Sequence, residues 1–120
     1  MPETKKTYLA VFLGSRAAME KFRQKPEAER MEMEKKGIAA WKAWADKHKG
    51  AIVEMGGPLG KTKQVTEKGV TDTRNEMGAF TVVRAATHET AAKMFEGHPH
   101  FTMFPGESVE IMEVLQIPMG

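Results

Sequence analysis

A long helical segment stands between two strand-forming runs in the first half of the chain. Tyr8–Leu13 is a continuous apolar run of β-forming residues, and 51–55 is a second run of the same kind. Between them, Pro26 suits the first turn of a helix, where its missing N–H is not needed, and Gly50 suits the end of a helix. This order predicts a β-α-β unit whose helix packs across a sheet.

The register of the helix predicts which face it buries. Apolar and polar residues at three- and four-residue steps define one stripe, made of Glu34, Ile38, Trp41, Ala45 and His48 with Ala40 and Trp44 alongside. Because it carries both tryptophans, this stripe is predicted to face the sheet. Gly37 lies within the helix, where it marks either a kink or a close approach of another segment.

The second half of the chain predicts a hairpin followed by a second strand–helix–strand unit. Two polar arms, Thr62–Thr66 and Val70–Arg74, flank a glycine turn and predict a hairpin. A β-prone run follows at 78–85, then a short helix capped by Thr87, and the final strand is Ser108–Gln116. The prediction is therefore an α+β fold, a ferredoxin-like βαββαβ sandwich with an inserted hairpin, in a single domain over 1–120. One face of its sheet needs a cover, which predicts a homodimer that packs sheet against sheet.

Composition excludes several classes of protein. The 120 residues contain no cysteine, which excludes a disulfide scaffold and a thiol nucleophile. A net charge of +2, without clustered arginines or interleaved aromatics, argues against a nucleic-acid partner. Apolar runs are too short for a membrane span, so no membrane partner is expected and the predicted location is cytoplasmic.

His98 and His100 are the candidate chemical groups. They flank Pro99, and in extended backbone residues two apart point the same way, so both imidazoles would converge on one ligand. Three interpretations stay open: structural residues, a site for an organic molecule or anion, and a metal site. A metal would need a third ligand, and no carboxylate stands at a spacing that favours it, so neither metal nor cofactor is predicted.

Two further pairs are candidates for ligand contacts. Asp72 and Arg74 are alternate residues on one hairpin arm and share a face, where they form either a surface ion pair or the polar wall of a pocket. Trp41 and Trp44 would supply an aromatic surface opposite. The predicted ligand-binding residues are Trp41, Trp44, Asp72, Arg74, His98 and His100.

The order and spacing of four motifs resemble the YCII-related (DGPF) family of small dimeric α/β-barrel proteins. These motifs are the Tyr8–Leu13 strand, the Trp-rich helix before Gly-Gly-Pro-Leu at 56–59, Met-Gly-Ala-Phe at 77–80, and the His-Pro pair before the last strand. The resemblance implies a ferredoxin-like fold and a dimer whose sheets pack together. Some relatives are lyases that use a His–Asp pair. At the corresponding positions this chain has Ala40 or Trp41, and His98 before Pro99.

Three functions follow as hypotheses. The first is a homodimer that binds a small anionic or aromatic molecule in a cleft between helix and sheet. The second is a lyase or isomerase with His98 or His100 as the catalytic general base. The third is a structural or regulatory protein whose only specific contact is with itself. The sequence does not decide whether the protein is an enzyme.

Overall fold

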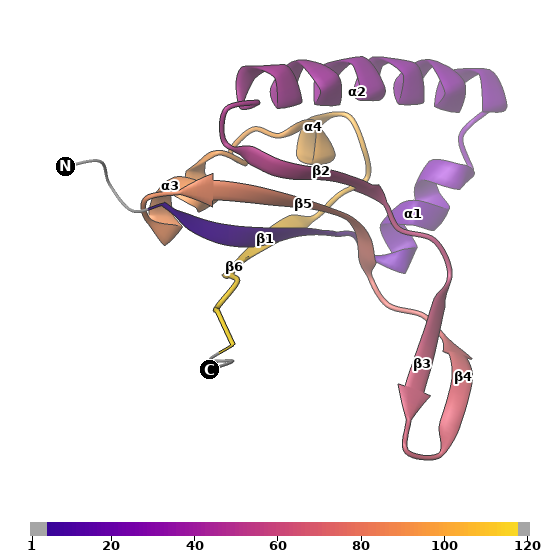
Figure 1. Ribbon diagram of the computed structural model, residues 1–120. Helices are drawn as coiled ribbons and strands as arrows, with labels where there is room; N and C mark the ends of the chain where they lie inside the picture. The colour runs from indigo at the N-terminus through magenta and orange to yellow at the C-terminus, as the bar shows by residue number, and fades with distance from the viewer. Residues whose placement is uncertain (1–4, 118–120) are drawn as a thin grey trace.

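The computed structural model describes residues 5–117 (Figure 1). Its helices and strands are β1 (Lys6–Leu13), α1 (Arg16–Arg23), α2 (Glu27–Lys47), β2 (Ile52–Pro58), β3 (Thr62–Thr66), β4 (Gly69–Thr73), β5 (Met77–Ala85), α3 (His88–Lys93), α4 (Pro99–Thr102) and β6 (Ser108–Glu113).

Four strands form one antiparallel sheet in the order β2-β5-β1-β6, and β3 pairs with β4 in a separate hairpin. The central strand β1 is joined to the edge strand β2 through α1 and α2, and the central strand β5 is joined to the edge strand β6 through α3 and α4. This order and the layer of helices confirm the α+β, ferredoxin-like prediction and the inserted hairpin.

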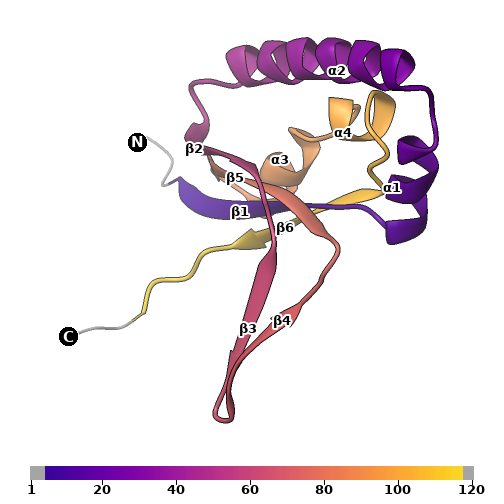
Figure 2. The same cartoon turned by 90° about the vertical axis from the view of Figure 1, so that its right-hand side faces the viewer.

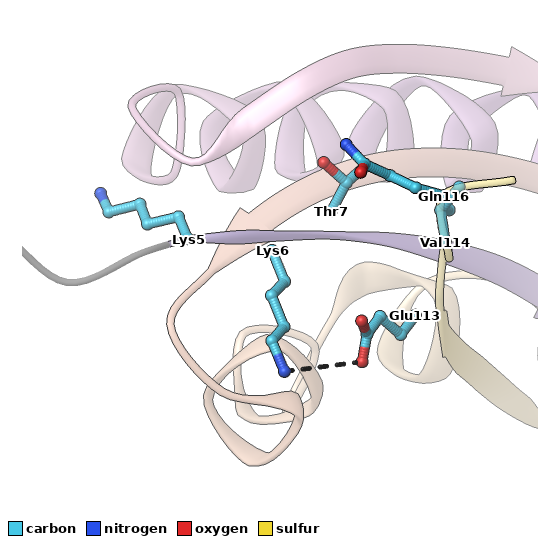
Figure 3. A pocket seen from close by; sticks show the side chains of 6 residues that line it. All are labelled: Lys5, Lys6, Thr7, Glu113, Val114 and Gln116. Carbon is cyan, nitrogen blue, oxygen red and sulfur yellow. Dashed lines mark ion pairs between the residues drawn. The ribbon is translucent and has the colours of Figure 1, made fainter. Parts of the chain in front are cut away.

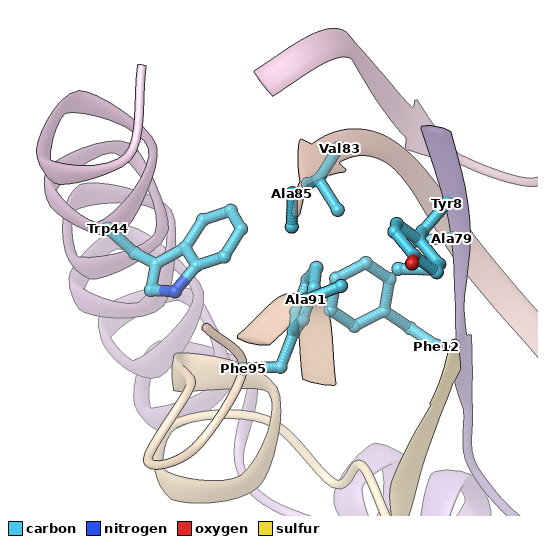
Figure 4. Close-up of a cluster of buried hydrophobic side chains, with 9 residues drawn as sticks. Tyr8, Phe12, Trp44, Ala79, Val83, Ala85, Ala91 and Phe95 are labelled. Carbon is cyan, nitrogen blue, oxygen red and sulfur yellow. The ribbon is translucent and has the colours of Figure 1, made fainter. Parts of the chain in front are cut away.

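The core lies between the sheet and the helices (Figure 4). Alternate residues of β1 (Tyr8, Ala10 and Phe12) point into it, because successive side chains of a strand face opposite sides of the sheet. Phe95, just after α3, and Trp44 of α2 close the core from the helix side. The indole N–H of Trp44 donates a hydrogen bond to the backbone oxygen of Met94, at 2.8 Å.

The buried face of α2 keeps most of the predicted stripe: Trp44 is buried, and Trp41 and Ala45 pack against the core. Glu34 and Ile38 depart from the prediction, and Ile38 is 65 % exposed. Gly37 is buried instead, by a close approach, the second of its two interpretations: the Phe104 ring lies against the helix backbone where a side chain would stand. Because the ring occupies this side, Ile38 lies on the flank of the helix.

Several boundaries differ from the sequence prediction. The segment at 98–106, between the predicted short helix and the final strand, contains the short helix α4, whose first turn begins at Pro99. A further helix, α1, follows Ser15, whose side chain accepts a hydrogen bond from the N–H of Ala18, and the long helix ends at Lys47, before Gly50. β2 continues to Pro58, because a bulge at Gly56 (φ 67°) lets the strand keep pairing with β5.

The sheet has one face turned away from the helices. Leu9 and Val11 of β1 lie on it, with their register partners Val82 and Phe80 of β5 and with Met112 of β6. Figure 2 shows α2, α3 and α4 on the other side, and the β3–β4 hairpin and the segment after β6 extending away from them. We call the face formed by these five apolar residues the open face.

Candidate functional site

A cleft of about 1710 Å³ opens between α2 and the sheet. α1 closes one end, the segment around Phe104 lies beneath α2, and the base of the β3–β4 hairpin forms a further wall. Ile38 and Trp41 of α2 both line the cleft: Ile38 is 65 % exposed, whereas Trp41 also packs against Phe12 of β1, with ring centroids 4.8 Å apart. A concave space of this size is larger than most small-molecule pockets, which measure about 300–1,000 Å³.

Apolar side chains gather in the cleft although water reaches them. Met19 of α1, Ile38 of α2 and Met55 of β2 line it and are all exposed. The half-buried rings of Trp41 and Phe104 stand beside them, 5.9 Å apart and inclined at 65°. Exposed apolar groups that converge on one concavity are a feature of binding sites rather than of plain surface.

Positive charge exceeds negative charge around the cleft. Six basic residues line it, Arg16, Arg23, Lys42, Lys61, Lys63 and Arg74, against three acidic ones, Glu34, Asp72 and Glu76. Within residues 5–117, the only ion pair among these joins Lys63 to Asp72, at 2.6 Å across the hairpin. The surplus of cations favours an anionic occupant.

His100 reaches the cleft from α4 but is held by the strands. Its Nε2 lies 2.9 Å from the carbonyl oxygen of Leu13 and 3.0 Å from that of Ser108, so the ring N–H donates where β1 ends and β6 begins. Gly106 provides the space, because a side chain there would overlap the imidazole. His100 therefore links the end of β1 to the start of β6 through Nε2, and its Nδ1 atom remains as a hydrogen-bond acceptor.

His98 lies inside the core. Its side chain is fully buried, and its Nδ1 accepts a hydrogen bond from the backbone N–H of His100 at 2.9 Å, which caps α4. The Nε2 atom has no hydrogen-bond partner among the described residues, and the rings of Trp41, Trp44 and Phe12 surround it. Burial lowers the pKa of His98 to about 4, with further contributions from His100 and His48, so the imidazole is neutral at pH 7.

The two imidazoles therefore do not converge as expected. The expectation assumed extended backbone, but Pro99 opens a helical turn, and the rings diverge: His98 into the core, His100 toward the strand ends. The structure brings Trp41, Asp72, Arg74 and His100 to the cleft wall. Trp44 and His98 lie behind Trp41, whose ring centroid is 4.4 Å from that of His98.

Sequence reasoning missed the contribution of α1. Arg16, Met19 and Arg23 stand three and four residues apart, so they share one helical face, and all three line the cleft. That spacing was readable in the sequence. The contribution of Phe104 was not, because it depends on contact with a distant glycine in α2.

The other parts of the described chain have fewer features of a binding site than the cleft. A second hollow of about 430 Å³ lies beside the start of β1 (Figure 3) and is lined by Lys5, Lys6, Thr7, Glu113, Val114 and Gln116. It holds one ion pair, Lys6 with Glu113 at 4.0 Å, and no aromatic ring. Over residues 5–117 no three histidine, aspartate or glutamate side chains gather as they would around a metal ion. In the same range, no helix combines the length and the hydropathy needed to cross a membrane.

No family model matches the chain, and no curated protein sequence matches it. Among solved structures, the fold is similar to that of 5-chloro-2-hydroxyhydroquinone dehydrochlorinase from Burkholderia phenoliruptrix, solved in complex with 2,5-dihydroxybenzoquinone. The two chains are 16 % identical, with a TM-score of 0.52, and the match covers 88 % of this chain and 90 % of the other. At this identity, the likeness establishes a shared fold over most of both chains.

Proposed function

We propose that this chain is a YCII-related homodimer that binds a small, flat, anionic molecule with an aromatic or quinonoid ring in the cleft beside α2. The observation that carries the proposal is the pairing, in one concavity, of exposed apolar side chains with a surplus of cations. An apolar ligand would not use the charges, and a small inorganic anion would not use the apolar wall.

The apolar wall suits a ring. The Trp41 indole and the Phe104 ring meet at an angle, and Ile38 extends the same surface along α2. A planar ligand would cover these groups on one face and gain the burial of exposed apolar area, about 25 cal/mol for each Å². Aromatic partners add further stabilisation through offset or edge contacts.

The cationic rim suits oxygen anions. Arg16 and Arg23 come from α1, and Arg74 comes from the hairpin base, so the guanidinium groups approach from two sides. Guanidinium groups form paired hydrogen bonds with carboxylates and other oxyanions. The ligand of the similar dehydrochlorinase structure, 2,5-dihydroxybenzoquinone, is a flat ring with four oxygen substituents and belongs to the class that such a site would accept.

The open face supports the dimer. Leu9, Val11, Phe80, Val82 and Met112 are neighbours on this face across three strands, with the exposed Glu110 of β6 opposite Val11 at its margin. Sheets with two apolar faces are stable when both are covered, and a second copy would cover this one by packing sheet against sheet.

The two other hypotheses remain predictions. A lyase or isomerase would need an imidazole that can take a proton: His98 is buried with its Nδ1 in a structural hydrogen bond, whereas His100 keeps Nδ1 while its Nε2 is bonded to two strand ends. Purely structural self-association would share the dimer but would leave the cleft without a ligand. No described feature favours either hypothesis over ligand binding.

The test is calorimetric titration of the protein with 2,5-dihydroxybenzoquinone and with benzoate. Ile38→Asp places a negative charge in the apolar wall, and we expect it to weaken binding at least tenfold. Met31→Asp is the matched control, because Met31 is an equally exposed apolar residue of α2 that does not line the cleft. The proposal is wrong if neither compound binds the wild type, or if Ile38→Asp binds as tightly as Met31→Asp.

A further inference from the structure

The β3–β4 hairpin (residues 62–73), called the arm below, packs little against the rest of the chain. Every residue of its two strands is exposed except Thr62, which is half-buried at the base. Both views show it extending away from the helix layer, on the same side as the open face (Figures 1 and 2). The radius of gyration is 16.6 Å, against about 14 Å for a compact chain of this length.

The two faces of the arm differ in character. Val65 and Val70 are register partners on one face, and they are 74 % and 63 % exposed; the Lys63–Asp72 ion pair lies on the same face, nearer the base. Gln64 and Thr71 are partners on the other face. A two-stranded hairpin is marginally stable in water by itself, and an exposed valine pair adds apolar area that needs a cover.

The dimensions of a sheet-to-sheet dimer place this arm against the second copy. Packed sheets lie about 10 Å apart, while strands of five residues reach roughly 17 Å, so the arm extends past the partner's sheet. The arm, together with the exposed Val114, Leu115 and Ile117 after β6, adds exposed apolar side chains to the apolar residues of the open face.

We propose that the β3–β4 arm of each copy clasps the edge of the other copy's sheet, with Val65 and Val70 buried against it. This inference rests on the proposed homodimer. It also links the dimer to the cleft, because Lys63, Asp72 and Arg74 at the base of the arm line the cleft. Fixing the arm on the partner fixes that wall, so association and ligand binding strengthen each other.

The test compares two double variants of the full chain by analytical ultracentrifugation over a range of concentrations. Val65→Asp with Val70→Asp changes the apolar face of the arm, and we expect at least a tenfold increase in the dimer dissociation constant. Gln64→Asp with Thr71→Asp adds the same charges to the same strands on the opposite face, and we expect no change. Circular dichroism of both variants checks that they are folded.

A second measurement covers the case in which the charged hairpin does not form. Because the chain has no cysteine, a single Val70→Cys change introduces a unique thiol. We expect its maleimide modification to slow several-fold as protein concentration rises through the dissociation constant, while Thr71→Cys keeps a constant rate.

The outcomes separate the two proposals. A wild type that is monomeric at all concentrations overturns both the proposed dimer and the clasp. A dimer that persists unchanged in the Val65→Asp/Val70→Asp variant, with a constant rate for Val70→Cys, overturns the clasp and leaves the sheet-to-sheet dimer standing. Equal loss of the dimer in both double variants overturns the assignment of the contact to the valine face.

Discussion

The Nδ1 atom of His98 accepts a hydrogen bond from the backbone N–H of His100 at 2.9 Å, inside the core and beneath Trp41. The bond requires His98 to be neutral at Nδ1, since a protonated nitrogen cannot accept. The stability of the segment around α4 is thereby coupled to the protonation of one buried imidazole.

This coupling predicts a loss of stability in acid. The pKa of His98 is lowered by burial from 6.5 in the unfolded chain to about 4 in the folded one. Between these values the unfolded state binds the proton more tightly, so the free energy of unfolding should fall as pH drops from about 6.5 toward 4, by up to about 3 kcal/mol. Urea denaturation at pH 7, 5.5 and 4.5 measures the loss.

His98→Asn is the informative variant for that experiment. Its side-chain oxygen retains a cap acceptor but does not titrate, so its stability should vary less over this range than that of the wild type. Parallel curves for His98→Asn and the wild type would mean that other groups cause the acid dependence.

The close approach of Phe104 to Gly37 predicts that a methyl group added at Gly37 destabilises the fold, whereas one added at Gly50 has little effect. Gly37→Ala should lower the free energy of unfolding by about 1–3 kcal/mol, because its Cβ would overlap the Phe104 ring. Gly50→Ala is the control, since nothing lies within 4 Å of its added Cβ. In a double-mutant cycle measured by chemical denaturation, Phe104→Ala should remove most of the effect of Gly37→Ala; independent effects would contradict the contact.

The bulge at Gly56 predicts a difference between two adjacent glycines. Gly56 has φ 67°, and an added Cβ would overlap the carbonyl oxygen of Phe80, whereas Gly57 has open space at this position. We expect Gly56→Ala to cost about 1–3 kcal/mol in thermal unfolding and Gly57→Ala to cost well under 1 kcal/mol. Equal losses would show that β2 tolerates a different path past β5.

The cationic face of α1 predicts a salt-dependent affinity. Arg16→Ala and Arg23→Ala should each weaken the binding of benzoate several-fold at low ionic strength, and less at high salt, because screening weakens charge attraction. Lys21→Ala on the same helix is the control, since Lys21 does not line the cleft. Equal effects of the three substitutions in titration calorimetry would point to a general field of the helix instead of a site.

The fold was largely predictable because its signals are local. The apolar run Tyr8–Leu13, the cap at Thr87 and the glycine turn of the hairpin each identify an element from a few neighbouring residues.

The candidate site was less predictable because it depends on contacts between distant segments. The burial of Gly37 in place of Ile38 depends on Phe104, and the direction of the His98 ring depends on the helical turn that Pro99 opens. Neither of these two features can be inferred from the spacing of residues that are neighbours in the sequence. The cationic face of α1 is the exception, since its three- and four-residue steps were visible from the start.

The charged groups of the cleft come mostly from segments that the core does not use. α1 and the base of the β3–β4 hairpin supply most of its charged groups, whereas the core cluster consists of side chains from the sheet, α2 and the region of α3. Substitutions at these charged positions change what the cleft attracts at little cost to folding stability. A lineage built on this scaffold can therefore diversify its ligands by drift in two peripheral segments while the same hydrophobic interior persists.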